Sequence, residues 1–279
     1  MSTTGKLVLG TVQFGVQYGI NSAGRPDEQM VKAILEEAQA LGINTLDTSS
    51  GYGEAEEILG RTISKGHPFK IVSKYPKGNV PVKEMFLSSL DRLKVNSLFG
   101  YLLHHFEVYR DNPDVWREFM ALKEDGKVQR IGFSLYMPDE LEILLKNNVD
   151  FNLLQIPRNI FDRKFDPYLR ELKDRGVEIH VRSTFLQGLF FKDRQTLPDK
   201  LKPLKKYLEE LDNISKETGM SIAELALNFN YQNENIAGVL IGVDNVDQLK
   251  TNVGSLSDQS VNIDISVKEK ELLNPVNWN

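Results

Sequence analysis

Eight short apolar segments recur along the chain, and amphipathic segments separate each one from the next. A short apolar run rich in branched side chains is typical of a strand buried on both faces, as strands of a parallel sheet are. The pattern predicts eight strands, at residues 6–12, 43–47, 69–74, 99–104, 129–134, 151–156, 177–182 and 238–242.

Helical periodicity fills the segments between these runs. Residues 27–41 place their apolar side chains on one face, between Pro26 and Gly42, which are common start and stop signals. Similar patterns predict helices at 54–65, 82–94, 113–125, 138–147, 166–175, 200–218, 221–232 and 246–253. Strands that are each followed by a helix predict a (β/α)₈ TIM barrel, an α/β fold of about 250 residues. A doubly wound sheet fits this pattern less well, and no linker-like segment divides residues 1–279, so a single domain is expected.

Composition and charge exclude several classes of protein. The net charge of −5 argues against nucleic-acid binding, which favours a basic surface. No apolar run approaches the roughly 18 residues of a membrane span, and no basic-then-apolar leader is visible at the start. The chain has no cysteine and so no disulfide or thiolate site. We therefore expect a cytoplasmic protein.

Polar residues stand at the ends of the predicted strands, where barrels of this type carry their chemistry. Asp47 ends the second strand, Tyr52 follows in a Gly-rich loop, and Lys74 ends the third strand. A buried Lys74 needs a partner because an unpaired buried charge is costly, and Asp47 can be that partner. A surface lysine or a purely structural pair stays open. A cation near Tyr52 is expected to lower the pKa of its phenol from about 10 and to make it a general acid.

Two adjacent histidines end the fourth predicted strand. His104 faces the same end of the barrel and could orient a carbonyl oxygen, whereas His105 is expected to point away because side chains alternate along a strand. Adjacent histidines on opposite faces do not form a metal site, so none is expected. The GxGxxG, GxxxxGK[ST] and GxSxG motifs are absent, so nothing supports a Rossmann site, a P-loop or a hydrolase elbow.

The order and spacing of Asp47, Tyr52, Lys74 and His104 resemble the catalytic tetrad of the aldo-keto reductases, in a short, bacterial-type member. The resemblance runs along most of the chain. It includes LGT at 9–11, GINTLDTSSGYG at 42–53, SLDRL at 89–93, YLLH at 101–104, GKVQRIGFS at 126–134, LLQIPRNIFDR at 153–163, RSTFLQGLF at 182–190, AELALNF at 223–229 and LIGVDNVDQLKTN at 240–252. Each motif alone is weak, but their order is specific.

The resemblance implies a carbonyl reductase that uses a nicotinamide cofactor, usually NADP(H), with NAD(H) as the alternative. Tyr52 would donate a proton to the carbonyl oxygen while the cofactor supplies a hydride. Lys74 would lower the pKa of Tyr52, Asp47 would hold Lys74, and His104 would orient the carbonyl. The implied cofactor contacts are Thr11, Asp47, Ser134, Gln155, Arg182, Ser183, Phe185, Gln187, Gly242, Val243, Asp244, Asn245, Gln248 and Asn252.

The chain departs from the family pattern at the two ends of the implied cofactor site. Arg182 stands where many members have a tyrosine that stacks on the nicotinamide, and a guanidinium plane can also stack. Gly242 and Gln248 replace a lysine and an arginine that hold the 2′-phosphate in many members, and Asp244 adds a negative charge. Lys250 could compensate. The preference for NADP(H) is therefore less secure than the reductase activity.

The substrate is expected to be a small polar or sugar-like aldehyde or ketone, and the protein a monomer or weak homo-oligomer. Trp278 either covers the mouth or packs on the outside, and the candidate lining residues are Gln13, Phe14, Tyr18, Tyr75, His105, Phe106 and Arg158. Two alternatives stay open. A class I aldolase-type lyase would use Lys74 as a Schiff-base nucleophile. A non-catalytic subunit on the same fold would only sense the cofactor.

Overall fold

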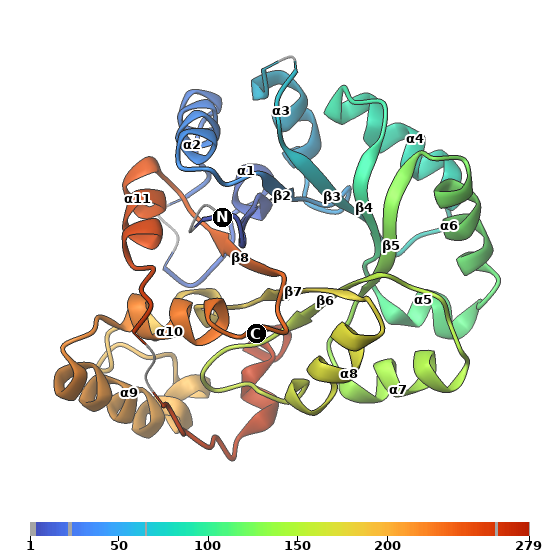
Figure 1. Ribbon diagram of the computed structural model, residues 1–279. Coiled ribbons are helices and arrows are strands. Elements are labelled where there is room, and N and C mark those ends of the chain that lie inside the picture. The colour runs from blue at the N-terminus through green and yellow to red at the C-terminus, as the bar shows by residue number, and fades with distance from the viewer. Residues whose placement is uncertain (1–3, 22–23, 65, 260–261, 279) are drawn as a thin grey trace.

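Eight parallel strands close into a barrel in which each strand pairs with its neighbours in sequence and β8 pairs with β1 (Figure 1). The computed structural model describes residues 4–21, 24–64, 66–259 and 262–278. The strands are β1 (Leu7–Gly10), β2 (Thr45–Asp47), β3 (Lys70–Tyr75), β4 (Leu98–Leu103), β5 (Val128–Ser134), β6 (Leu153–Pro157), β7 (Glu178–Arg182) and β8 (Gly238–Gly242). The predicted barrel and all eight strand positions are confirmed.

Helices surround the barrel at the positions that the periodicity predicts. The first of them, α2 (Glu28–Ala40), begins where the Asp27 side chain accepts a hydrogen bond from Met30 N, as an N-cap residue does. The others that match are α3 (Ala55–Thr62), α4 (Val82–Leu93), α6 (Val115–Glu124), α7 (Pro138–Lys146), α8 (Leu169–Asp174), α9 (Lys205–Thr218), α10 (Ile222–Tyr231) and α11 (Val246–Gly254). Lys65, the last residue of the predicted helix 54–65, lies outside the described residues. No helix in the described ranges is both long and apolar enough to cross a membrane.

The structure differs from the predicted elements in its short helical segments. Two α-helices were not predicted, α1 (Val12–Gly15) and α5 (Phe106–Asp111), and each is too short to show an apolar period. Two predicted helices begin as 3₁₀ segments, at η1 (Asp166–Tyr168) and η3 (Asp199–Leu204). Pro203 explains the second case, because it has no N–H for an α-helical bond and α9 begins only after it. Three further 3₁₀ segments are η2 (Leu186–Phe191), η4 (Lys270–Leu273) and η5 (Pro275–Trp278).

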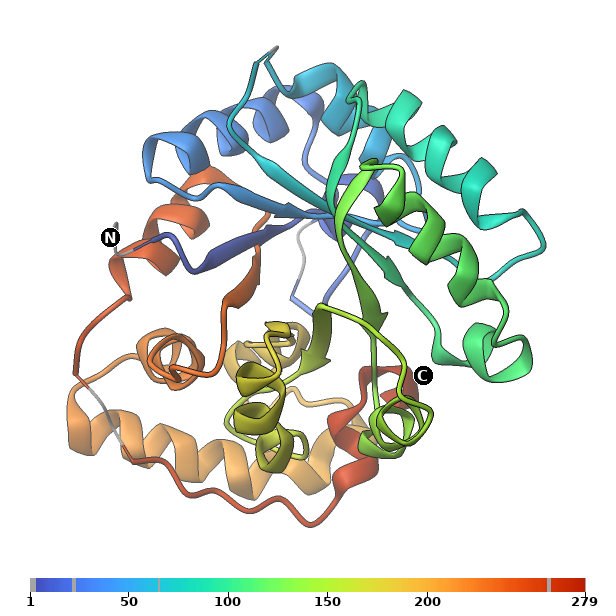
Figure 2. The same ribbon diagram turned by 45° about the vertical axis from the view of Figure 1, so that its right-hand side comes forward.

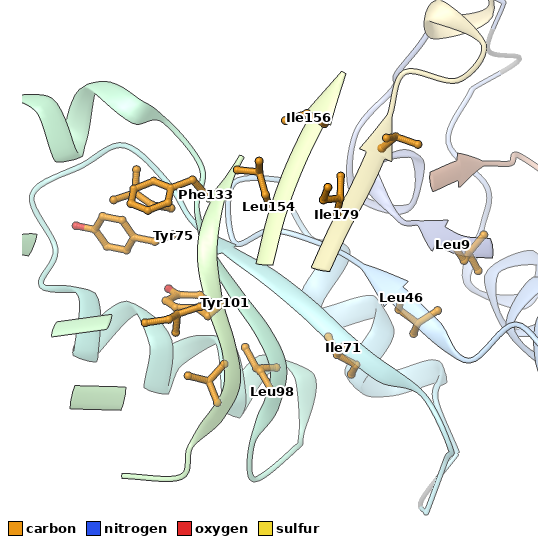
Figure 3. Packing of buried hydrophobic residues seen from close by; sticks show 14 of the residues in the cluster. Leu9, Leu46, Ile71, Tyr75, Leu98, Tyr101, Phe133, Leu154, Ile156 and Ile179 are labelled. Atoms are coloured by element: carbon orange, nitrogen blue, oxygen red, sulfur yellow. The ribbon is translucent and has the colours of Figure 1, made fainter. Parts of the chain in front are cut away.

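The main core lies between the outer surface of the barrel and the helices. Figure 3 shows Tyr75, Tyr101 and Phe133 on the side of the strands that faces the helices. Tyr101 stacks on Phe119 of α6 with ring centroids 5.3 Å apart. The interior is filled separately, by Val72, Leu102 and Leu153. The barrel interior is therefore packed with side chains, and a ligand site is expected at the end of the barrel.

A second apolar cluster lies under α9, α10 and the C-terminal segment (Figure 2). Tyr207 of α9 donates a hydrogen bond to Glu269, and Arg163 binds Asp264, so the C-terminal segment is attached along this side of the molecule. Trp278 packs against this cluster and donates to Leu272 O at 2.8 Å. Of the two alternatives for Trp278, the structure shows packing on the outside and not over the mouth.

Candidate active site

The predicted tetrad comes together at the C-terminal end of the barrel. Asp47 is the last residue of β2, Lys74 is the penultimate residue of β3, and His104 directly follows β4. Parallel strands carry their C-terminal ends to one rim, which is why residues far apart in sequence meet there. A cavity of about 630 Å³ opens at this rim, within the usual size range of a ligand site.

Lys74 and Asp47 form a buried ion pair at this cavity, and Asp47 lines it. Lys74 Nζ lies 2.6 Å from Asp47 Oδ1 and 2.8 Å from Thr48 O, and the Lys74 side chain has no exposed surface. Asp47 Oδ2 accepts a hydrogen bond of 2.7 Å from Gln155 Nε2. Thr11 donates to Asp47 O at 3.0 Å. The carboxylate is therefore held by Lys74 of β3 and Gln155 of β6, while Thr11 holds the backbone carbonyl of Asp47. The carboxylate in turn fixes the ammonium in one position.

Tyr52 joins this pair from the loop after β2. Its hydroxyl lies 3.4 Å from Lys74 Nζ, and Lys74 Nζ lies 5.0 Å from the centre of its ring. The ring meets His104 edge-on, with centroids 5.6 Å apart. Tyr52 is half-buried and lines the cavity, whereas Lys74 lies beneath it. The phenol is therefore the member of the Asp47–Lys74–Tyr52 chain that a ligand can reach.

Gly15, the last residue of α1, sets the position of the Tyr52 loop. A Cβ atom built on Gly15 would lie 1.7 Å from Tyr52 O and 2.7 Å from Ala55 N. Only glycine permits this close approach of α1 to the loop, because both nearest atoms belong to the backbone. The contact was not predicted from sequence, where Gly15 carries no local signal.

Substituting Gly15→Ala should force the Tyr52 loop away from α1 and destabilise the protein by about 1–3 kcal/mol. Urea unfolding would measure the loss. Gly254→Ala is the matched control: Gly254 also ends a helix, and a Cβ there meets nothing within 4 Å. Similar unfolding midpoints for the two variants would show that the close contact between Gly15 and the Tyr52 loop does not require glycine.

The pKa of Tyr52 moves opposite to the sequence-based expectation. Burial raises it above its ordinary value, and the negative charge of Asp47 raises it further, while Arg182 opposes both. Asp47 lies 2.6 Å from Lys74 Nζ, so the phenol faces a compensated ion pair rather than an isolated cation. The prediction that the pKa of Tyr52 lies below its ordinary value is wrong for this structure, because burial and Asp47 raise it. The phenol keeps its proton at neutral pH.

His104 is neutral at physiological pH. Burial lowers its pKa well below the ordinary value, and the positive charge of Lys74 lowers it further. Its Nδ1 lies 3.1 Å from Ser49 Oγ, a contact that the sequence did not suggest. A neutral imidazole can either donate or accept at its other nitrogen, so it can orient a polar ligand without adding a charge.

His105 lies beside His104 and does not point away from it. The two rings are 4.7 Å apart and tilted by 34°. The expected alternation fails because β4 ends at Leu103 and His105 already caps α5. Among the residues that the structure describes, no three His, Cys, Asp or Glu side chains gather as a metal site would require.

Arg182 lies at the same rim and is held by the β5–α7 loop. Its guanidinium packs 4.1 Å from the centre of the Tyr136 ring and donates to Leu135 O at 3.1 Å. It also lines the cavity. Arg182 therefore brings a fixed positive charge close to Tyr52.

Most of the predicted cofactor residues line one continuous cavity. They are Thr11, Asp47, Gln155, Arg182, Ser183, Phe185, Gln187, Gly242, Asp244, Asn245, Gln248 and Asn252. Ser134 and Val243 are buried and are not among the lining residues. Val243 packs instead in the main core, because its side chain faces the helices.

The expected substrate-lining residues divide into two groups. Gln13 and Tyr18 line the cavity. The other five are not among its lining residues. The His105 ring lies against that of His104, and the remaining four side chains are buried in other contacts. Phe14 is in the core, Tyr75 donates to Val80 O, Phe106 packs on Tyr109, and Arg158 pairs with Asp166.

The loop between α1 and α2 makes contacts along the cavity wall that the sequence did not predict, although Tyr18 and Gln187 were expected to line the cavity. Ile20 N donates to Gln187 O at 3.1 Å, and Asn21 Nδ2 donates to Gly188 O at 2.6 Å. Gln187 Nε2 donates to Tyr18 at 2.9 Å. Residues 18–21 and 187–188 therefore join across the cavity. These contacts link loops more than 160 residues apart, so no local pattern could reveal them.

Comparisons with known proteins place this geometry in one family. Residues 6–266 match the profile described as the aldo/keto reductase family. The oxidoreductase YqkF of Bacillus subtilis is 26% identical over 79% of this chain and 80% of its own length. The NADH-specific methylglyoxal reductase of Escherichia coli is 24% identical over 91% of this chain and 90% of its own length.

The same fold occurs in a solved aldo-keto reductase from Bacillus halodurans in its holo form. The two structures superpose with a TM-score of 0.72 at 24% identity, over 92% of this chain and 88% of the other. The predicted barrel and the predicted family are both confirmed.

Proposed function

Because this chain belongs to the aldo/keto reductase family, we propose that it reduces an aldehyde or ketone to an alcohol, with a nicotinamide dinucleotide as hydride donor. The observation that carries the proposal is the Asp47–Lys74–Tyr52 chain, which ends in a phenol that reaches the cavity beside neutral His104. Each of these side chains is held by at least one further contact, as a preorganised site requires.

The cavity has the size and polar groups that a dinucleotide needs. Gln13 Oε1 and Asp244 Oδ1 are buried oxygen atoms without a hydrogen-bond partner among the described residues, and both residues line the cavity. Unpaired buried acceptors are costly unless a ligand donor binds them. Thr11, Gln155 and Arg182 would hold the nicotinamide end, and Ser183 and Gln187 the pyrophosphate. The bound cofactor supplies the hydride.

The residues of the chain would supply the proton and hold the carbonyl. Tyr52 would donate its proton to the carbonyl oxygen. Lys74, held by Asp47, would stabilise the negative charge that forms on Tyr52. His104 would orient the carbonyl oxygen, with Ser49 holding its Nδ1.

The pH dependence of the two reaction directions follows from the raised pKa of Tyr52. A pKa above 10 keeps the phenol protonated, so carbonyl reduction should stay level between pH 6 and about pH 9. Alcohol oxidation needs the deprotonated phenol and should rise continuously over the same range. Rates at saturating cofactor would measure both profiles. A fall in reduction centred near pH 7 would contradict the assignment, because it would require a phenol with a strongly lowered pKa.

We propose a small polar carbonyl compound as the substrate, sugar-like aldehydes and 2-oxoaldehydes included. Tyr18 and Arg182 make the wall near Tyr52 polar. A relative of similar length is named for reduction of methylglyoxal. A panel that compares hydroxyaldehydes and 2-oxoaldehydes with bulky steroid-like ketones tests this. Equal rates on both groups would remove the basis for the assignment.

The structure gives less support to an aldolase-type reaction. A Schiff-base lysine must present a free amine to the substrate. Lys74 Nζ contacts Asp47, Thr48 O and Tyr52, and the side chain is fully buried beneath the cavity. Borohydride trapping of a carbonyl compound on Lys74 would restore this alternative. A subunit that only senses the cofactor would bind it without measurable turnover on any carbonyl of the panel.

A further inference from the structure

The two ends of the cavity carry opposite charge. Arg182, near Tyr52, is the one lysine or arginine among the described residues that line it. At the other end, between β8 and α11, the wall carries two carboxylates, those of Asp244 and Asp247. The remaining side chains of that end are neutral: Asn245, Gln248, Thr251 and Asn252. A doubly charged anion would therefore meet only like charge there.

Lys250 does not supply the missing cation. It lies on α11, but its Nζ is 3.5 Å from Glu37 Oε2 of α2, and it is not among the lining residues. Figure 1 shows α11 and α2 side by side on the outside of the barrel. The structure therefore does not support the option that Lys250 compensates for the lost basic residues. Its charge pairs with α2.

The N-terminus of α11 is already capped by side chains of the chain itself. Gln248 N donates to Asn245 Oδ1 at 2.9 Å, and Asp244 N donates to Gln248 Oε1 at 2.8 Å. A helix start can bind a phosphate through its free N–H groups, but two of the N–H groups here are taken. Asp247 adds a negative charge in the first turn. This helix start is therefore poorly suited to a phosphate group.

Asp244 is suited to a hydroxyl donor instead. Its Oδ1 is buried and lacks a hydrogen-bond partner among the described residues. Burial raises the pKa of this carboxyl group. A hydrogen-bond donor that binds the carboxylate would oppose this shift, because it stabilises the ionised form. A ribose hydroxyl is such a donor. An acidic residue that accepts from the ribose 2′-hydroxyl is also how many dinucleotide sites select the unphosphorylated cofactor.

We propose that this end of the cavity binds an adenosine ribose with a free 2′-hydroxyl, so that the protein uses NAD(H) and rejects NADP(H), with Asp244 as the selecting residue. The proposal rests on the proposed function, because it assumes that the adenosine end of the dinucleotide lies between β8 and α11. It replaces the family-based preference for NADP(H). The physical basis is hydrogen bonding to the 2′-hydroxyl and charge repulsion of a 2′-phosphate.

Calorimetric titration of the whole protein with ADP and with 2′,5′-ADP tests the adenosine end without any turnover. ADP should bind at least about tenfold more tightly than 2′,5′-ADP, because the 2′-phosphate of the latter would lie beside carboxylates of like charge. The Asp244→Asn variant keeps the side-chain shape and removes the charge. It should therefore reduce the ratio of the 2′,5′-ADP to the ADP dissociation constant at least about fivefold. Asp139→Asn is the matched control, because Asp139 lies in the first turn of α7 and outside the cavity.

Parallel titrations with NAD⁺ and NADP⁺ separate failure of this proposal from failure of the proposed function. Equal or tighter binding of 2′,5′-ADP and NADP⁺ by the unaltered protein would overturn the proposal and leave the reductase function intact. An ADP preference that Asp244→Asn leaves unchanged would overturn the role of Asp244. Failure of all four nucleotides to bind would overturn both.

Discussion

Replacing Tyr52 with phenylalanine should lower carbonyl reduction by about 10²–10⁴-fold and leave dinucleotide binding unchanged, since a positioned general acid contributes that much to a proton transfer. The hydroxyl lies 3.4 Å from Lys74 Nζ, while the ring packs edge-on against His104. The substitution removes the proton and keeps the ring. Steady-state rates and calorimetric affinities measured on one preparation would check both parts of the prediction.

Tyr168→Phe is the matched control for this experiment. The substitution also removes a hydroxyl that donates a hydrogen bond, in this case to Glu142, but Tyr168 does not line the cavity. It should retain full activity. Near-normal turnover by the Tyr52→Phe variant would remove the proposed mechanism, because no other phenol of the described residues lies within hydrogen-bond range of Lys74.

Replacing Lys74 with methionine should reduce both stability and activity. The substitution leaves Asp47, whose side chain is 3% exposed, as a buried carboxylate without its cation. Removal of one partner of a buried pair costs about 3–5 kcal/mol. The free energy of unfolding in urea would measure this loss. Activity should also fall, because the negative charge that forms on Tyr52 loses its nearest cation.

The double variant Lys74→Met/Asp47→Asn separates the two effects. It no longer buries an unpaired charge, so it should recover much of the lost stability and none of the activity. Lys32→Met serves as a surface control. Lys32 is 63% exposed and lies 3.9 Å from Glu36, so its loss should change stability by less than about 0.5 kcal/mol. An equal loss in the free energy of unfolding for Lys32→Met and Lys74→Met would show that the buried pair contributes no more to stability than a surface pair.

Much of the fold and the tetrad could be predicted from the sequence. Apolar runs and helical periodicity are local signals, and they placed all eight strands within a few residues of their observed bounds. Because parallel strands bring their C-terminal ends to one rim, Asp47, Lys74 and His104 could be expected to meet before any distance was known.

Other parts of the site could not be predicted because they depend on contacts between distant segments. The Gly15 contact with the Tyr52 loop and the joining of residues 18–21 to 187–188 leave no periodic pattern. His105 was placed wrongly because strand alternation was extended past the real end of β4.

The sequence by itself determined the barrel, the family and the four residues at its rim, since these follow from local periodicity and from the order of the strand ends. Only the tertiary structure decided the electrostatics. Burial and the compensating Asp47 raise the pKa of Tyr52, although a nearby lysine suggested the reverse. The pairing of Lys250 with Glu37 leaves the α11 end of the cavity acidic. The effect of a charge depends on its burial and on its partners, and both are properties of the folded chain.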